Sequence, residues 1–250
     1  MKERKIVLIT GAAKGIGKAI AIELAQNNYD IVINYLTSQS EAITLQNYLI
    51  DTYNINCLAI KADVSKEDEV ANMISEIENK IGNVDILINN AAIDLSNMFN
   101  LKTAEEFRRV LDVNVIGAYN VSKACAKHML ENEYGKIINI SSTNGINTYY
   151  PMSIDYDASK AALISLTHNL AMQYAPYINV NAIAPGFIGT ESELDGYDSD
   201  FIKSEQEKIL LKRYGEPEEV AHLVKFLISD EADYINNSVI RIDGGQIGSI

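Results

Sequence analysis

Short apolar runs rich in β-branched residues alternate along the chain with longer amphipathic stretches. The runs predict strands, and most are apolar on both faces, as strands buried inside a parallel sheet are. They cover Lys5–Thr10, Asp30–Tyr35, Asn56–Lys61, Val84–Asn89, Gly135–Ser141, Ile178–Ala184 and Ser238–Ile242. This alternation predicts an α/β fold, in which one doubly wound domain over residues 1–250 holds about seven parallel strands with helices on both faces.

The stretches between these runs have helical spacing. Helices are expected over Lys14–Asn27, Ser38–Tyr53, Ser65–Ile81, Ser153–Tyr174 and Glu216–Ser229, and Thr103–Glu133 is long enough for two. Ser65 opens its helix with a Ser-Lys-Glu-Asp pattern that resembles a capping box. Residues 187–214 break the alternation, are acidic and then regain helical spacing, which predicts an excursion over the sheet edge that acts as a lid.

Composition narrows the functional classes. The chain has 250 residues, of which 47% are apolar, and a formal net charge of −13. A domain of this size buries enough surface to fold without disulfides or a structural metal. Its two cysteines and three histidines form no metal motif, and no apolar run reaches the ~18 residues of a membrane span. These exclusions together lead us to expect a cytoplasmic protein. Its acidity disfavours binding to nucleic acid and to anionic lipid, so we expect it to bind neither.

A glycine-rich turn directly follows the first predicted strand and opens the first predicted helix. It reads Thr10-Gly11-Ala12-Ala13-Lys14-Gly15-Ile16-Gly17. Gly11 permits a tight turn, and a side chain at Gly15 or Gly17 would block a pyrophosphate that approaches the N–H groups of the helix N-terminus. Its place in a βαβ unit predicts a dinucleotide site, with an ordinary strand-to-helix turn as the alternative.

A second pattern, Tyr156-Asp157-Ala158-Ser159-Lys160, places a tyrosine and a lysine four residues apart on a predicted helix. Side chains at this spacing share one helix face. A nearby ammonium favours the phenolate and lowers the pKa of a tyrosine from its usual value of about 10. Tyr156 is therefore a candidate acid–base group, and it follows a buried strand that ends in Ser141-Ser142.

These motifs, in this order, resemble the short-chain dehydrogenase/reductase family, whose members have a Rossmann fold and use a nicotinamide cofactor. The resemblance spans residues 4–245 and includes Gly11-x-x-x-Gly15-x-Gly17, Asn89-Asn90-Ala91-Ala92, Ser142-x-x-Gly145, Tyr156-x-x-x-Lys160 and Ile242-Asp243-Gly244-Gly245. It implies that Tyr156 exchanges a proton with the substrate, while Lys160 lowers its pKa and bonds the nicotinamide ribose. Ser142 would orient the substrate oxygen, with Ser141 as the alternative, and Asn114 would hold a water of a proton relay.

The resemblance also implies which residues hold the cofactor. They are Gly11, Lys14, Gly15, Ile16, Gly17, Asn34, Tyr35, Asp63, Val64, Asn90, Tyr156, Lys160, Pro185, Gly186, Ile188 and Thr190. NAD sites place an acidic residue near the end of the second strand, but the stretch from Ile33 to Ser38 contains none. Because Lys14 offers a positive charge to a 2′-phosphate, the sequence favours NADP over NAD.

Within the family, the sequence is most similar to bacterial 3-oxoacyl carrier-protein reductases, which implies a carbonyl, alcohol or acyl thioester substrate and a homotetramer. Glu131–Tyr134 and Ala171–Tyr174 lack the basic residues with which those enzymes dock their acidic carrier. A sugar, polyol or small ketone is therefore the close alternative. A nucleotide-binding regulator without catalysis is the alternative from another class, but the complete set of Asn114, Ser142, Tyr156 and Lys160 favours an enzyme.

Overall fold

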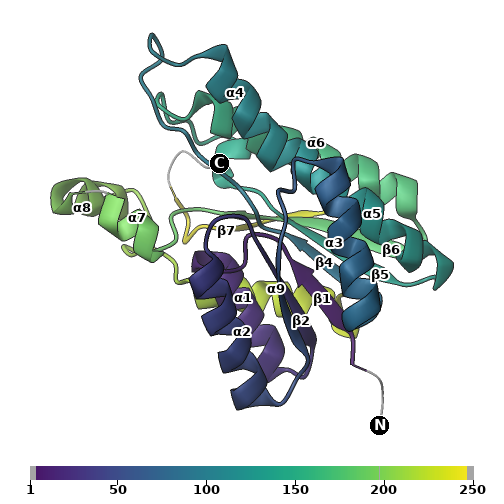
Figure 1. Ribbon diagram of the computed structural model, residues 1–250. Helices are drawn as coiled ribbons and strands as arrows, with labels where there is room; N and C mark the ends of the chain where they lie inside the picture. The colour runs from purple at the N-terminus through teal and green to yellow at the C-terminus, as the bar shows by residue number, and fades with distance from the viewer. Residues whose placement is uncertain (1–3, 197, 247–250) are drawn as a thin grey trace.

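The computed structural model describes residues 4–196 and 198–246, which contain a seven-stranded parallel sheet at the centre (Figure 1). The strands are β1 (Ile6–Ile9), β2 (Asp30–Tyr35), β3 (Cys57–Lys61), β4 (Ile86–Asn89), β5 (Gly135–Ile140), β6 (Ile178–Pro185) and β7 (Val239–Ile242). Their order across the sheet is β3-β2-β1-β4-β5-β6-β7. The predicted fold class is confirmed, and each predicted run forms a strand with small differences at its ends.

Helices cover both faces of this sheet (Figure 1). One face carries α1 (Gly15–Gln26), α2 (Gln39–Tyr53) and α9 (Pro217–Ile228), and the other carries α3 (Glu67–Lys80), α5 (Gly117–Glu131) and α6 (Ile154–Tyr174). Successive strand side chains point to opposite faces, so Ile9 and Ile31 pack with the first group while Leu8 and Val32 pack with the second. Within residues 4–196 and 198–246, no helix combines the length and apolar content needed to cross a bilayer.

The two helices expected within Thr103–Glu133 form one continuous helical run. α4 (Ala104–Leu111) passes through a π-helical segment, Asp112–Ile116, directly into α5. A capping box starts the run, because the Thr103 hydroxyl accepts the N–H of Glu106 while the Glu106 carboxylate accepts the N–H of Thr103. The run therefore changes its hydrogen-bond pattern in the middle without a break in the chain direction.

The capping box expected at Ser65 is wrong. α3 begins at Glu67, so Lys66 and not Ser65 occupies the N-cap position. Among the described residues, the Lys66 side chain makes no capping hydrogen bond. The Ser65 hydroxyl instead donates to the Asp63 carboxylate at 2.6 Å, in the loop after β3. Because the Ser65 hydroxyl is bonded to Asp63, it does not cap the start of α3.

The excursion of residues 187–214 leaves the sheet after β6. It contains α7 (Glu191–Gly196) and α8 (Ser199–Glu207), which project to one side of the sheet in Figure 1, while Tyr197 lies outside the described residues. Single β-bridges fasten the excursion near both ends, from Ile188 to Gly215 and from Ile209 to Gln246. These fastenings place the two short helices beside the carboxyl ends of the strands.

Candidate active site

The strand order reverses between β1 and β4, and in a doubly wound sheet ligands bind at the carboxyl ends of the strands at this point. A cavity of about 350 Å³ lies there. The implied cofactor residues that line it are Gly11, Lys14, Asn34, Tyr35, Asp63, Val64 and Asn90. The structure thus brings together residues from the carboxyl ends of four different strands, β1 to β4.

The glycine loop leaves no space for a side chain at Gly11 or Gly17. A Cβ on Gly11 would lie 2.9 Å from the Cα of Ala91, and one on Gly17 would lie 2.6 Å from the amide nitrogen of Asn90. Gly11 and Gly15 also have φ angles of +62° and +54°, in the left-handed region that favours glycine. Ile16 is the second residue of α1, so the loop delivers the start of this helix to the site. Such a cradle at a helix N-terminus fits a pyrophosphate.

Two asparagines brace the glycine loop from behind. The buried Asn34 donates its amide to the Ala62 carbonyl at 3.1 Å, and its side-chain oxygen accepts the N–H of Gly11 at 3.4 Å. Asn90 donates its amide to the carbonyls of Thr10 and Gly11, at 2.9 and 3.1 Å. Both side chains therefore fix the backbone that forms the cradle.

An arginine that the sequence analysis did not select also lines the cavity, beside Asp63. Arg109, on α4, lies 3.1 Å from the carboxylate of Asp63 and donates to the Ser65 hydroxyl at 3.0 Å. Burial opposes the ionisation of Asp63, but hydrogen bonds from Ser65 and Arg109 outweigh it and hold the pKa of this carboxyl below its usual value. Because 46 residues separate Arg109 from Asp63, nothing in the local sequence signals the pair.

Lys14, at the edge of the cavity, has an acidic neighbour. Its ammonium lies 2.7 Å from the carboxylate of Glu41, in the first turn of α2, and both side chains are largely exposed. The hydrogen bond from Lys14 holds the pKa of Glu41 below its usual value. A 2′-phosphate would have to share or replace this contact to reach the lysine.

Tyr156 and Lys160 lie at the start of α6, beside the end of β5. The Lys160 side chain is buried, and its ammonium donates to the carbonyl of Ile140 at 2.8 Å. Its nitrogen lies 5.3 Å from the centre of the Tyr156 ring. Burial lowers the pKa of Lys160 to about 8. The ammonium thus lies near the Tyr156 ring, and a positive charge there favours the phenolate form.

The two serines after β5 have different partners. Ser141 is buried and its hydroxyl donates to the carbonyl of Lys160 at 2.9 Å, which ties β5 to α6. Ser142 is half-buried and its hydroxyl accepts the N–H of Asn144 at 3.1 Å, at the start of a 3-10 turn, Thr143–Gly145. A Cβ on Gly145 would lie 2.6 Å from the carbonyl carbon of Lys160, so the turn packs directly on α6.

Asn114 lies in the π-helical segment and is buried. Its oxygen accepts the N–H of Ile93 at 2.8 Å, and its amide donates to the Ile93 carbonyl and to the Ser159 hydroxyl, both at 2.9 Å. The side chain thereby connects the loop after β4 with α6. A π-helical turn inside an α-helix frequently marks a functional position.

The remaining implied cofactor residues follow β6. Pro185 ends the strand, Gly186 donates its N–H to the Ile242 carbonyl at 3.0 Å, and Ile188 bridges to Gly215. A Cβ on Gly15 would lie 3.4 Å from a methyl of Thr190, so this segment reaches the glycine loop. In the described chain, the implied residues outside the cavity lining are Gly15, Ile16, Gly17, Tyr156, Lys160, Pro185, Gly186, Ile188 and Thr190.

Comparisons with known proteins bear on this site. A family profile described as enoyl-(acyl carrier protein) reductase matches residues 11–246. The 3-oxoacyl-[acyl-carrier-protein] reductase FabG of Staphylococcus epidermidis is 39% identical over 244 residues, which cover 97% of this chain and 98% of the relative. The chain belongs to the short-chain dehydrogenase/reductase family. The resemblance seen in the motifs is therefore confirmed over nearly the whole length.

Other relatives of this short-chain dehydrogenase/reductase differ in their stated substrates. Glucose 1-dehydrogenase 2 of Bacillus subtilis is 36% identical over 246 residues, 97% of this chain and 94% of the relative. The solved structure of ElxO with NADP bound superimposes with a TM-score of 0.88 at 34% identity and covers 97% of this chain and 98% of that one. This short-chain dehydrogenase/reductase is thus an oxidoreductase of a family that uses NAD or NADP, and its relatives fit both the acyl and the sugar alternatives.

Proposed function

We propose that this enzyme reversibly transfers a hydride between NADP(H) and a carbonyl or secondary alcohol, with Tyr156 as the acid–base group. The observation that carries the proposal is the buried Lys160 ammonium, 5.3 Å from the Tyr156 ring. Burial lowers the pKa of Lys160 to about 8, so this group can change protonation near neutral pH. A regulator without catalysis would have no use for such a pair.

Each group of the catalytic set has a distinct task. When bound, the nicotinamide supplies or accepts the hydride. Tyr156 gives a proton to the carbonyl oxygen during reduction and takes one from the alcohol during oxidation, and Lys160 favours its phenolate. Ser142 orients the substrate oxygen, which is supported by its half-exposed position, whereas Ser141 is buried and donates to the Lys160 carbonyl. Asn114 keeps the loop after β4 beside α6 and supports the proton relay.

The cavity and the glycine cradle fit a dinucleotide. Gly11, Gly15, Ile16 and Gly17 would hold the pyrophosphate at the start of α1. The adenosine half would contact Asn34, Tyr35, Asp63, Val64 and Asn90, and the nicotinamide half would contact Tyr156, Lys160, Pro185, Gly186, Ile188 and Thr190. We propose NADP over NAD, because Lys14 lines the cavity and ElxO, a similar structure, has NADP bound.

A 3-oxoacyl thioester is the proposed substrate, on the similarity to the carrier-protein reductase of Staphylococcus epidermidis. One observation favours the alternative of a sugar, polyol or small ketone. Glu131–Tyr134 and Ala171–Tyr174, the segments with which similar carrier-protein reductases dock their carrier, contain no Lys or Arg. These segments therefore offer no positive charge to an acidic carrier protein.

Residues 187–214 are proposed to act as a lid. The Tyr150 hydroxyl, in the loop before α6, donates to the buried carboxylate of Glu205 on α8 at 2.9 Å. At the base of the excursion, the Phe187 ring stacks on that of Tyr214 with 5.1 Å between ring centres. These contacts support closure of the excursion against the catalytic loop.

We also propose a homotetramer that works in the cytoplasm. The run from the π-helical segment into α5 exposes the large apolar side chains of Ile116, Tyr119 and Leu130, which supports pairing of this run between copies. In the described chain Cys57 and Cys125 are free, as is usual in a reducing compartment. A monomer in light scattering at working concentration would contradict the assembly.

The proposed function is tested with Tyr156→Phe and a substrate panel. The variant should lose turnover by about 10²- to 10⁴-fold, because the substitution removes the proton donor, while its Kd for NADPH stays within about twofold. NADPH and NADH binding is measured by fluorescence titration. The panel contains free and carrier-linked 3-oxoacyl thioesters, sugars and small ketones.

Tyr234→Phe is the matched control, because that tyrosine is fully exposed, and it should behave as the unmodified enzyme. Near-normal turnover by Tyr156→Phe would contradict the assigned role. Cofactor binding by the unmodified enzyme without turnover on any member of the panel would favour a regulator.

A further inference from the structure

A buried ion pair outside the catalytic set joins two segments of the site. Lys102 lies just before α4, and Asp155 lies in the first turn of α6. Their nitrogen and oxygen are 2.8 Å apart, and the side chains are only 5% and 0% exposed. The Lys102 ammonium also donates to the Leu95 carbonyl, and the second oxygen of Asp155 accepts the N–H of Tyr156 at 3.0 Å. The pair therefore reaches from the loop after β4 to the backbone of the acid–base residue.

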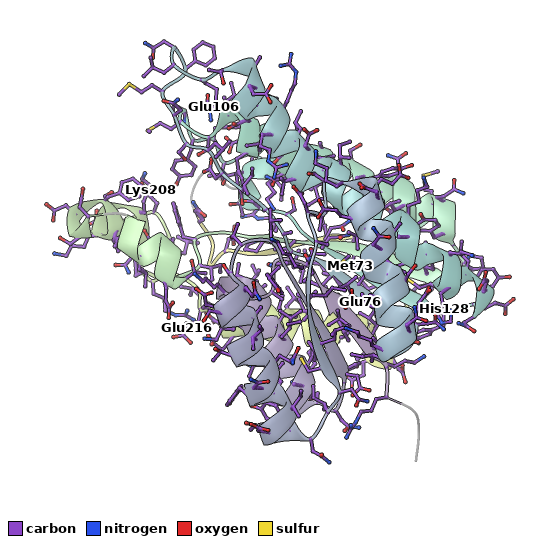
Figure 2. All side chains as sticks on the ribbon, viewed as in Figure 1. Met73, Glu76, Glu106, His128, Lys208 and Glu216 are labelled. Carbon is purple, nitrogen blue, oxygen red and sulfur yellow. The ribbon has the colours of Figure 1, made fainter. Side chains whose placement is uncertain are left out.

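Further hydrogen bonds connect the same two segments, residues 93–102 and 150–155. The N–H of Asn97 donates to the Met152 carbonyl at 3.0 Å. The Ser153 hydroxyl donates to Asp94 at 2.9 Å and lies 3.1 Å from the Ser96 hydroxyl. We call these contacts, together with the ion pair, the loop clamp. In Figure 2, Glu106 marks the first turn of α4, which follows directly after the clamped loop.

Stability alone is a poor explanation for the ion pair. Two charges taken out of water lose their hydration, and apolar residues of similar volume generally stabilise a buried site as well or better. An ion pair with hydrogen bonds on both sides forms only when its two segments take one relative position, whereas apolar side chains tolerate small shifts. Because Asp155 accepts the N–H of Tyr156, a fixed position of the two segments also fixes the backbone of the acid–base residue.

We propose that Lys102 and Asp155 are positioning residues that hold residues 93–102 against the first turn of α6 and thereby fix Tyr156 relative to the bound substrate. They act through the Tyr156 backbone and do not touch the reacting atoms. This inference rests on the proposed function, since it assigns the clamp a role in the turnover that Tyr156 supports.

The test compares single and double replacements. K102M or D155L alone leaves one buried charge without its partner, so each should lower the Tm. The double variant K102M/D155L removes both charges and should return the Tm to within a few degrees of the unmodified enzyme. The matched control is K80M/E76L, which replaces a lysine and a carboxylate in the same way in an exposed pair with a 2.7 Å contact; Glu76 is labelled in Figure 2.

A positioning role predicts that the double variant recovers stability without recovering turnover. Its kcat should remain about 10- to 100-fold low, because a misplacement of about 1 Å can have that effect, while its Kd for NADPH stays within about twofold. KM should change less than kcat. Recovery of both Tm and kcat in the double variant would overturn the proposal and leave the pair a purely structural role.

A conservative variant covers the case in which the double variant does not fold. D155N keeps the size of the side chain and an oxygen for the Tyr156 N–H, but removes the charge that binds Lys102. Its kcat per NADPH-binding site should fall about tenfold. An unchanged kcat would overturn the proposal.

Hydrogen exchange provides a measurement that does not depend on turnover. Amides of residues 93–102 and of the first turn of α6 should exchange at least about tenfold faster in K102M/D155L, while those of β1 and β4 stay unchanged. Unchanged protection of the clamped segments would contradict the clamp whatever the activity. An unmodified enzyme that turns over no substrate would instead refute the proposed function and leave this measurement valid.

Discussion

The two sides of the site differ in what they bury. The cofactor side, at the glycine loop and the ends of β1 and β4, has no room for a side chain at Gly11 or Gly17. The catalytic side, formed by residues 93–102, the turn after β5 and α6, buries charged and amide side chains. On the first side, a Cβ on Gly17 would lie 2.6 Å from the Asn90 amide nitrogen. On the second, Lys160, Asp155 and Asn114 are 3%, 0% and 1% exposed, and each contacts a residue at least 20 positions away.

The difference lies in what each side requires of its residues. A cradle requires space, which glycine provides at its own position. A buried charge or amide requires a partner, and here the partner comes from another element. Added volume should therefore damage the cofactor side. On the other side, removal of the Lys160 ammonium, which donates to a carbonyl, should damage catalysis while relieving the free-energy cost of burying the charge.

The largest expected effect comes from Lys160→Met, which separates catalysis from stability. Turnover should fall by about 10²- to 10⁴-fold. Burial lowers the pKa of Lys160 from 10.5 to about 8, which corresponds to a cost of about 3 kcal/mol for the charged form in the folded protein. The free energy of unfolding at pH 7 should therefore rise in the variant. Loss of the hydrogen bond to Ile140 should reduce this gain by about 1 kcal/mol.

The pH dependence gives the sign of this effect. Between pH 8 and 10.5 the unfolded chain binds more protons at Lys160 than the folded chain does, so the stability of the unmodified enzyme rises with pH there. The advantage of Lys160→Met should be complete below pH 8 and shrink through this window. Urea unfolding at pH 7 and pH 10 measures it. If Lys160→Met were less stable than the unmodified enzyme at pH 7, burial of this charge would carry no free-energy cost, and the contrast with the cofactor side would be wrong.

The next effect in size is that of Gly17→Ala on the cofactor side. The new methyl would meet the Asn90 amide at 2.6 Å and the Gly11 carbonyl oxygen at 2.8 Å. We expect a Kd for NADPH raised about 10- to 100-fold and a free energy of unfolding lowered by about 1–3 kcal/mol. Fluorescence titration and urea unfolding measure both. Gly196→Ala is the control, since no described atom lies within 4 Å of its Cβ position, and tight NADPH binding by Gly17→Ala would show that the cradle has spare room.

The smallest effect concerns an exposed charge and sharpens the choice of cofactor. Lys14→Ala should raise the KM for NADPH about tenfold, because one charge-assisted hydrogen bond contributes on the order of 1.5 kcal/mol, and should leave the KM for NADH within about twofold. Glu41→Gln frees the lysine from its 2.7 Å contact and should lower the KM for NADPH about two- to threefold. Steady-state kinetics with both cofactors check this, and equal losses with both would argue against a 2′-phosphate contact.

The sequence predicts the parts of this site that depend on local pattern. The glycine loop, the pair of Tyr156 and Lys160, and the serines after β5 are all recognisable from residue type and spacing. The prediction of two helices in Thr103–Glu133 does not reveal the π-helical segment around Asn114. Asn114 bonds Ile93 and Ser159, which are distant in the sequence, so local spacing carries no sign of these contacts. The capping prediction at Ser65 fails because the hydroxyl bonds Asp63.

The sequence by itself determined the strand runs, the order of the elements and the family motifs, because hydrophobic periodicity and glycine placement are read within a few neighbouring residues. Only the tertiary structure decided that Arg109 holds Asp63, that Glu41 stands beside Lys14, and that Lys102 and Asp155 form a buried pair. A charge in the sequence reveals neither its burial nor its partner. Both depend on which elements pack together, and 53 residues separate the two sides of the loop clamp's ion pair.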